Sequence, residues 1–256
     1  MNLELDGKTA LVTGGSRGIG AATARVLAAE GVRLVLVARG GEALDRTAEA
    51  IAATGASVRT CVEDLADETA PERLAAAFPE VDILVNNAGG VPPGPLDALS
   101  VAAIRDGWAA KVFGYVGMIR AFRPLMASRG AGVVVNVIGM AGERVNAGMI
   151  ALTGANAALI AMTRALGAES PGSGVRILGV NPSMTATERA KTLWRDEASR
   201  TLGDGDRWPE LVAAQPFGRP ADPDEIAAAI VFLASPRCGY VSGTVLNVDG
   251  GLGARP

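Results

Sequence analysis

Residues 8–20 read KTALVTGGSRGIG, so that an apolar run leads directly into a glycine-rich turn. We predict a strand over Lys8–Thr13 and a helix over Gly18–Glu30 on the two sides of this turn. The glycines allow a tight turn, close approach of backbone to a pyrophosphate, and close packing of helix on strand. Free N–H groups at the start of the helix suit the same anion. The pattern favours a dinucleotide loop over a plain tight turn, with contacts from Gly14, Ser16, Arg17, Gly18, Ile19 and Gly20.

Short apolar runs alternate with alanine-rich, helix-length stretches along the rest of the chain. The further predicted strands are Arg33–Ala38, Ser57–Val62, Val81–Asn86, Gly132–Val137, Val175–Asn181 and Thr244–Val248. The predicted helices between them are Glu42–Thr54, Ala70–Phe78, Leu96–Met126, Met149–Glu169 and Asp222–Ala234. Strands that are apolar on both faces suit a parallel sheet covered by helices. We therefore predict an α/β fold, with one doubly wound, seven-stranded parallel sheet and helices on both faces.

No linker, repeat or low-complexity run divides the sequence, so residues 1–256 are predicted to form one domain. The stretch 187–217 breaks the alternation, becomes charged and holds Trp194 and Trp208. An insert before the last strand is expected to lie as a lid over a ligand crevice. The alternative is a solvated surface excursion.

Composition excludes several kinds of chemistry. The 256 residues include no His, which excludes an imidazole base, a Ser-His-Asp triad and an HExxH zinc site. Cys61 and Cys238 are too few for a disulfide framework or a cysteine-rich metal site, so we predict no metal. A net charge of −3 offers no basic field for nucleic acid or anionic membranes. With no uninterrupted apolar run of membrane length and an acidic start, MNLELDGK, we expect a soluble cytoplasmic protein.

Further motifs extend the pattern over nearly the whole chain. Asp64-Leu65 follows the third predicted strand, Asn86–Gly89 (NNAG) closes the fourth, and Asn181–Thr187 (NPSMTAT) closes the sixth. Near the end, Phe232–Ser235 (FLAS) precedes Val248–Gly251 (VDGG). Together with the G-x-x-x-G-x-G spacing, these motifs resemble the short-chain dehydrogenase/reductase family. The resemblance implies a Rossmann fold and a nicotinamide dinucleotide contacted by Asp64, Leu65, Asn87, Ala88, Gly89, Pro182, Thr185 and Thr187.

The charge at the end of the second strand bears on the choice of cofactor. An acid there accepts a hydrogen bond from the ribose 2′-OH of NAD(H) and repels a 2′-phosphate. This chain has Arg39 at that place and Arg17 in the glycine loop. Guanidinium groups bind phosphate through charge-assisted, often bidentate hydrogen bonds. We therefore predict NADP(H) in preference to NAD(H); the alternative for Arg39 is an ordinary solvated arginine.

All four catalytic positions of the family are substituted in this chain. The resemblance implies a Tyr-x-x-x-Lys pair on one helix, a Ser after the fifth strand and an Asn on the preceding long helix. Ala157–Leu159 sets the register of the first helix. It places Leu152 at the Tyr position and Asn156 at the Lys position. The Ser position is Gly139 and the Asn position is Lys111.

Lys111 and Asn156 have the pattern of an exchange, because one helix loses a lysine and its neighbour gains one. The exchange predicts an ammonium group delivered to the site from the other side; the alternative is that Lys111 points to solvent. Glu143 is a further candidate acid or base, with an exposed, structural pairing to Arg144 as its alternative. Tyr115 lies four residues after Lys111 on the predicted helix. We expect subunit packing for Tyr115 rather than catalysis, and a packing role for Tyr240.

The favoured interpretation is an NADP(H)-binding oxidoreductase that acts on a carbonyl or alcohol substrate with non-standard catalytic residues. The alternatives are a catalytically silent NADP(H)-binding sensor or partner subunit, and a non-redox lyase or isomerase that reuses the pocket. Few aromatic residues and several methionines predict a small, moderately apolar ligand. The resemblance implies a homodimer or homotetramer packed through the long helices.

Overall fold

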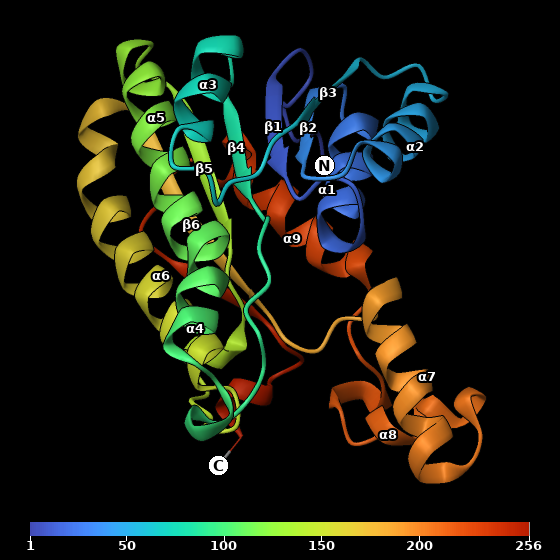
Figure 1. The fold of residues 1–256 in the computed structure, drawn as a ribbon. Helices are drawn as coiled ribbons and strands as arrows, with labels where there is room; N and C mark the ends of the chain where they lie inside the picture. The colour runs from blue at the N-terminus through green and yellow to red at the C-terminus, as the bar shows by residue number, and fades with distance from the viewer. Residues whose placement is uncertain (256) are drawn as a thin grey trace.

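The parallel sheet predicted from the sequence is confirmed by a computed structural model that describes residues 1–255 (Figure 1). Its strands are β1 (Thr9–Thr13), β2 (Arg33–Ala38), β3 (Val58–Val62), β4 (Ile83–Asn86), β5 (Gly132–Val137), β6 (Val175–Pro182) and β7 (Val245–Val248). All neighbours are parallel, in the order β3-β2-β1-β4-β5-β6-β7. The strand order reverses between β1 and β4, which is where open sheets of this kind bind ligands.

Helices cover both faces of this sheet. They are α1 (Gly18–Ala29), α2 (Gly41–Ala52), α3 (Ala70–Ala77), α4 (Val101–Trp108), α5 (Gly114–Ser128), α6 (Ile150–Glu169), α7 (Glu188–Leu202), α8 (Trp208–Val212) and α9 (Pro223–Ala234). Alternate residues of β1 point to opposite faces, as the pleat requires. Ala10 and Val12 join the apolar cluster that contains residues of α1, α2 and α9, whereas Leu11 joins the cluster with α3 and α5.

The predicted helix Leu96–Met126 is wrong as one uninterrupted element. A short turn at Leu96–Ala98 precedes α4, which starts where the Ser100 hydroxyl accepts a hydrogen bond from the Ala103 N–H at 3.1 Å. A wider π-type turn, Ala109–Phe113, then separates α4 from α5. Such turns are often found at functional sites. This one contains Lys111, which is buried.

Helix α6 is apolar enough that the segment Ile150–Ser173 passes a length and composition test for a membrane span. In this structure α6 is packed inside the domain. Leu159 and Ile160 belong to an apolar cluster, and Thr163 is buried and hydrogen bonded to β5. The segment is therefore a core helix of this fold.

A chain of buried amides joins the two central strands to α6. Asn86 and Asn136 are register partners at the ends of β4 and β5. The Asn86 Nδ2 donates to Asn136 Oδ1 at 2.9 Å, and Asn136 Nδ2 donates to Thr163 Oγ1 at 3.0 Å. Buried polar groups of this kind are costly when they lose a partner. The chain thus holds together the strand ends that carry the loops after residues 86 and 137.

We predict that Asn136→Ala lowers the free energy of unfolding by about 2–4 kcal/mol, because it leaves the Asn86 amide without its acceptor and removes a second buried bond. Urea denaturation of the variant and of Thr163→Val measures the effect. Thr163→Val, which removes only one of the two bonds, is expected to cost less. If Asn136→Ala loses no more unfolding free energy than Thr163→Val, the role given to the hydrogen bonds between Asn86, Asn136 and Thr163 is contradicted.

Candidate functional site

A large cleft opens at the carboxyl ends of the strands. Its volume is about 1660 Å³, and its walls come from the ends of β1, β2, β4, β5 and β6 and from the first turns of α7. Of the fifteen cofactor contacts expected from the sequence, fourteen line this cleft: Gly14, Ser16, Arg17, Gly18, Ile19, Arg39, Asp64, Leu65, Asn87, Ala88, Gly89, Pro182, Thr185 and Thr187. Residues from five separate segments of the sequence are therefore brought to one place.

Gly20, the remaining expected contact, lies behind the loop rather than in the cleft wall. A Cβ atom at this position would sit 2.3 Å from the Gly14 carbonyl oxygen and 2.5 Å from Asn87 Nδ2. No side chain fits such a space, so Gly20 allows α1 to approach the end of β1. Its part in the site is to shape the loop.

The amino end of α1 faces the cleft with free hydrogen-bond donors. The helix starts at Gly18, and the side chain of Arg17 before it does not cap the end. The first turn also has no acidic residue. Uncapped N–H groups and the helix dipole suit an anion. The residues present therefore fit the pyrophosphate of a dinucleotide.

Asn87 braces the glycine loop from the neighbouring strand. Its Nδ2 donates to the carbonyl oxygens of Thr13 at 3.0 Å and Gly14 at 3.2 Å. In return, the Thr13 hydroxyl accepts hydrogen bonds from the N–H groups of Asn87 and Ala88 at 2.9 and 3.0 Å. The NNAG motif therefore supports the loop as well as lining the cleft.

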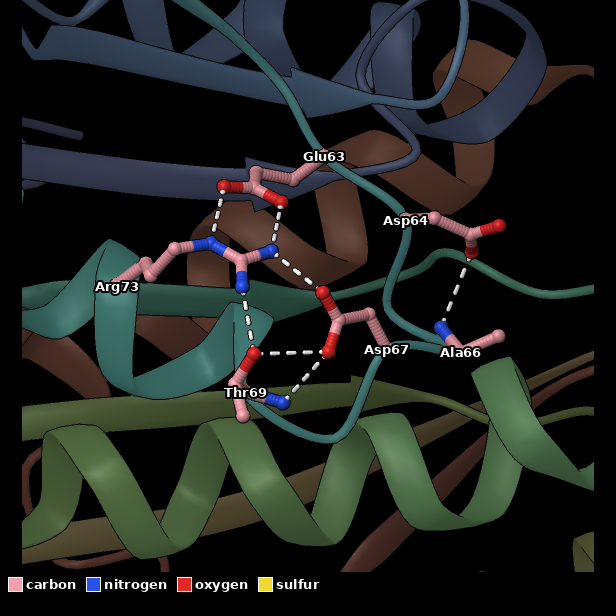
Figure 2. A network of polar contacts seen from close by, with 6 residues as sticks. All are labelled: Glu63, Asp64, Ala66, Asp67, Thr69 and Arg73. Carbon is pink, nitrogen blue, oxygen red and sulfur yellow. Dashed lines mark hydrogen bonds and ion pairs between the residues drawn. The ribbon is translucent and has the colours of Figure 1, made fainter.

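The two arginines expected to bind a phosphate are both exposed at the cleft. Arg17 and Arg39 line it, and neither forms an ion pair with any residue in the described range 1–255. Asp64 lies nearby but accepts a hydrogen bond from the Ala66 N–H at 3.0 Å (Figure 2). Two guanidinium groups are thus free to meet an anionic ligand.

Lys111 lines the cleft at the end of β5 and is only 8% exposed. Its ammonium donates to the carbonyl oxygens of Ile138 at 2.9 Å and Val137 at 3.2 Å. Burial lowers the pKa of Lys111 from 10.5 to about 8. Lys111 therefore carries an ammonium group that loses its proton close to neutral pH, and it does not point to solvent.

Asn156 holds the next carbonyl in the same run of backbone. Its Nδ2 donates to the Gly139 carbonyl at 3.2 Å, while the Gly139 N–H donates to Asn181 Oδ1, also at 3.2 Å. Gly139 has a φ of +124°, which L side chains rarely adopt, so the loop is built around a glycine at the family's serine position. Lys111 and Asn156 come from two helices and together contact three consecutive carbonyls, at 137, 138 and 139.

Tyr115 packs next to Lys111 on the side away from the cleft, and it does not line the cleft. It is fully buried, and its hydroxyl donates to the Val137 carbonyl at 2.9 Å, the same oxygen that Lys111 contacts. The Lys111 ammonium also lies 5.3 Å from the centre of the tyrosine ring. Burial raises the pKa of Tyr115, so the phenol stays neutral. Because Tyr115 is fully buried within its own chain, the expectation that it serves subunit packing is wrong. Tyr240 is fully exposed, so the packing expected of that residue is not found among the described residues.

Glu143 lies outside the cleft wall. Its carboxylate accepts a hydrogen bond from Arg164 of α6 at 2.9 Å, and its side chain is 32% exposed. Leu152, at the family's tyrosine position, does not line the cleft either. Glu143 is paired and exposed, as the alternative stated from the sequence expected, but its partner is Arg164. Arg144 instead donates to the Leu252 carbonyl at 3.3 Å. Glu143 therefore has no part in the mechanism below.

The segment 187–217 forms α7 and α8, which project from the rest of the molecule beside the cleft (Figure 1). Thr187 caps α7 by accepting a hydrogen bond from the Ala190 N–H at 3.2 Å. Trp194 and Trp208 stack with their ring centres 5.4 Å apart. The stacked pair joins the two helices into one unit, and residues 187–189, 192 and 193 face the cleft.

Several cleft residues were not expected from the sequence. They are mainly Val91, Pro92 and Pro93 after the NNAG motif, Asp106 on α4, and Arg189 and Leu193 on α7. The first three directly continue the loop after β4, so their place at a strand's carboxyl end was a usable signal. Arg189 and Leu193 belong to the segment 187–217 that was expected to cover the crevice, although neither was singled out. Nothing local marks Asp106, because tertiary packing alone brings α4 to the cleft.

The fold and this cleft define a dinucleotide-binding protein of the doubly wound α/β class. A family model described as enoyl-(acyl carrier protein) reductase matches residues 14–253. Galactitol 2-dehydrogenase (L-tagatose-forming) from Cereibacter sphaeroides is 40% identical over 251 residues, which cover 96% of this chain and 95% of that protein. D-threitol dehydrogenase from Mycolicibacterium smegmatis is 34% identical over 254 residues, with 98% and 94% covered.

A solved structure agrees with these relatives. L-sorbose reductase from Gluconobacter frateurii, complexed with NADPH and L-sorbose, superposes with a TM-score of 0.93 at 28% identity, over 100% of both chains. The chain belongs to the short-chain dehydrogenase/reductase family, as its motifs indicated.

We predict that the lowered pKa of Lys111 makes folding stability depend on pH. Between pH 8 and 10.5 the unfolded lysine holds a proton that the folded one has lost, so stability rises with pH in this window. Below pH 8 the full cost of the buried charge remains. Urea denaturation between pH 7.5 and 10 should therefore show wild type gaining stability relative to Lys111→Met. Lys8→Met, at an exposed lysine, should run parallel to wild type. Parallel curves for all three proteins would refute the shift.

Proposed function

We propose that this protein is an NADP(H)-dependent oxidoreductase that interconverts a carbonyl and a secondary alcohol, with Lys111 in place of the family's tyrosine as the proton donor. Its relatives named above are two polyol dehydrogenases and a ketose reductase. The cleft keeps the dinucleotide-binding residues of the family. The observation that carries the proposal is the buried ammonium of Lys111 at the end of β5, where the resemblance puts substrate chemistry.

The residues that would hold the cofactor divide into four groups. The N–H groups at the start of α1 suit the pyrophosphate, Asp64 and Leu65 suit the adenine end, and Pro182, Thr185 and Thr187 suit the nicotinamide end. Arg17 and Arg39 suit a 2′-phosphate, which favours NADP(H). When bound, the nicotinamide supplies or accepts the hydride of the reaction.

Lys111 supplies the proton for carbonyl reduction. An ammonium with a pKa of about 8 is mostly protonated at pH 7 and gives up its proton readily, which suits a general acid near neutrality. Two of its N–H groups are held by the carbonyls of Val137 and Ile138, which leaves the third for the substrate oxygen. The neutral amine left behind regains a proton from water. In alcohol oxidation the neutral amine accepts the hydroxyl proton.

Asn156 positions this acid by fixing the backbone on which Lys111 rests. Its bond to the Gly139 carbonyl holds the loop after β5 against α6. Asn156 itself is 1% exposed and does not line the cleft. It therefore acts through the loop rather than on the substrate.

The relatives and the cleft wall support a proposal for the substrate class. Galactitol, D-threitol and L-sorbose in the relatives' names all belong to the polyols and ketoses. In this chain, Val91, Pro92, Pro93 and Leu193 give the wall an apolar part. We therefore propose a small ketose or polyol, with a moderately apolar ketone as the alternative to be tested beside it.

The segment 187–217 is proposed to act as a lid. Its first turns line the cleft, and its own tryptophan pair makes it a unit that moves as one body. Leu193 lines the cleft and is 58% exposed, which leaves apolar surface for a bound substrate to cover.

We also propose a cytoplasmic homo-oligomer. Cys61 and Cys238 are both free thiols, which fits a reducing compartment. Val101, Phe113 and Met162 are exposed apolar residues on α4, the π-type turn and α6, where a second copy would cover them. Sedimentation velocity that finds only monomers at micromolar concentration would refute this assembly.

The decisive experiment for function is NADPH consumption against ketoses and cyclic ketones, with the variants Lys111→Met and Lys111→Arg. We predict that Lys111→Met lowers kcat by about 10²–10⁴, the usual effect of removing a general acid. Lys111→Arg is expected to be equally poor, because a guanidinium does not release its proton. Wild-type kcat for reduction should fall as the pH rises through about 8, and kcat for alcohol oxidation should rise.

Lys8→Met is the matched control for this series. Lys8 directly precedes β1, at the end of the strand away from the cleft, so its substitution should leave turnover unchanged. Retained kcat in Lys111→Met would remove Lys111 from the mechanism. Tight NADPH binding with no turnover on any substrate would instead identify a silent dinucleotide-binding protein.

For the lid, we predict that NADPH slows tryptic cleavage within 187–217. NADPH bound in the cleft would contact the first turns of α7 and hold this helix in place. Arg189, Lys191 and Arg195 offer cleavage sites in this segment. Mass spectrometry of timed digests locates each cut, and cuts outside 187–217 serve as the internal control. Equal rates at all sites with and without NADPH would count against a lid.

A further inference from the structure

Glu63 places a carboxylate beside the proposed 2′-phosphate site. It directly follows β3, whose last residue, Val62, is the register partner of Ala38 at the end of β2. The Glu63 N–H donates to the Ala38 carbonyl at 3.1 Å, so Glu63 lies next to the strand end that continues into Arg39. Glu63 and Arg39 both line the cleft.

A free carboxylate at this place opposes the binding of a 2′-phosphate. It repels the phosphate charge, and it is itself an acceptor for a ribose 2′-OH. The side chain of Glu63 is 17% exposed, so water screens it only in part. Left alone, Glu63 would favour NAD(H) and offset the effect of Arg17 and Arg39.

Arg73 of α3 holds this carboxylate in a bidentate ion pair (Figure 2). Its Nε donates to Glu63 Oε1 at 2.9 Å and its Nη2 donates to Glu63 Oε2 at 2.6 Å. Both carboxylate oxygens are therefore engaged by one cation. Figure 2 shows the Glu63 carboxylate turned toward Arg73, whereas the Asp64 carboxylate points elsewhere.

The loop before α3 fixes the guanidinium in this position. Arg73 Nη1 donates to Thr69 Oγ1 at 2.6 Å, and Arg73 Nη2 also donates to Asp67 Oδ2 at 2.8 Å. Asp67 in turn accepts hydrogen bonds from the N–H and hydroxyl of Thr69 at 2.9 and 2.8 Å. Such a network restrains the long arginine side chain, which an isolated surface pair does not do.

We propose that Arg73 is a specificity-determining positioning residue, which favours NADP(H) by neutralising Glu63 and holding it away from the phosphate. The proposal rests on the proposed cofactor preference and names the part of that site which no sequence motif marks. Arg17 and Arg39 attract the 2′-phosphate only because Arg73 removes the opposing charge beside them.

Glu63 does not lose its charge by protonation at neutral pH. The hydrogen bonds from Arg73 hold the pKa of Glu63 below its ordinary value, so the carboxylate is ionised at neutral pH. The ion pair is then the means by which its charge is cancelled. This makes the cofactor preference depend on Arg73, a residue of α3 that lies outside the glycine loop.

The test is a set of variants measured by calorimetric titration with NADP⁺ and NAD⁺, without turnover. Arg73→Gln frees Glu63 and is expected to lower the ratio of NADP⁺ to NAD⁺ affinity about tenfold, the scale of one uncompensated charge near a phosphate at an exposed site. The double variant Arg73→Gln/Glu63→Gln removes the freed charge and should restore the wild-type ratio. Asp67→Asn removes the second carboxylate that shares Arg73 and keeps the two bonds to Glu63, so the ratio should not fall.

The ratio separates specificity from damage to the fold. A variant that merely distorts the site loses affinity for both dinucleotides, and Glu63→Gln would not rescue it. An unchanged ratio in Arg73→Gln, or a lowered ratio that the double variant does not restore, overturns the proposal. A wild type that binds both dinucleotides equally refutes the proposed cofactor preference instead, and the role of Arg73 is still judged by whether its loss lowers the ratio.

Discussion

The hydrogen bonds from the Asn87 amide to the carbonyls of Thr13 and Gly14 hold together the two strands between which the sheet changes direction. β1 leads to α1 on one side of this point, and β4 leads to the opposite wall of the cleft. Because one amide spans the gap, the glycine loop keeps its shape without a ligand. The close approach at Gly20 depends on the same contact, since a Cβ there would meet both Gly14 and Asn87. The free N–H groups of α1 are aimed into the cleft as a consequence.

In our proposal, the charge at the phosphate site depends on residues outside the motifs that line the cleft. Arg17 and Arg39 mark a phosphate site by their position in the chain, but their field depends on what lies beside them. Glu63 is one strand away from Arg39 and would weaken that field. Arg73 cancels it from α3 through a network that includes Thr69 and Asp67. Selectivity in this proposal is therefore a property of two neighbouring strand ends and a helix, rather than of one residue after β2.

The strands and most helices were predictable because their cause is local. Apolar runs bounded by glycine and polar residues placed all seven strands to within about two residues, and the motifs named fourteen cleft residues correctly. The site was harder wherever a side chain's partner lies far along the chain. The pairing of Glu143 with Arg164 and that of Glu63 with Arg73 arise from packing. The widened turn at Lys111 was missed because Leu96–Met126 is helical in pattern throughout, and only Ser100 marks a break.

Burial explains why an ammonium suits this site better than a phenol would. Burial removes water and disfavours the charged form of any group. The same environment therefore lowers the pKa of an ammonium group and raises the pKa of a phenol. Lys111 and Tyr115 show this within one helical turn: burial lowers the pKa of the lysine to about 8 and raises the pKa of the tyrosine. A tyrosine acid needs a neighbouring cation to bring its pKa down, which is the part that the lysine plays in the family's pair. A buried lysine needs no such partner, because loss of its proton relieves the cost of burial. In the mechanism that we propose, one residue at position 111 replaces the work of two on α6. Leu152 and Asn156 are then free to serve packing and backbone support.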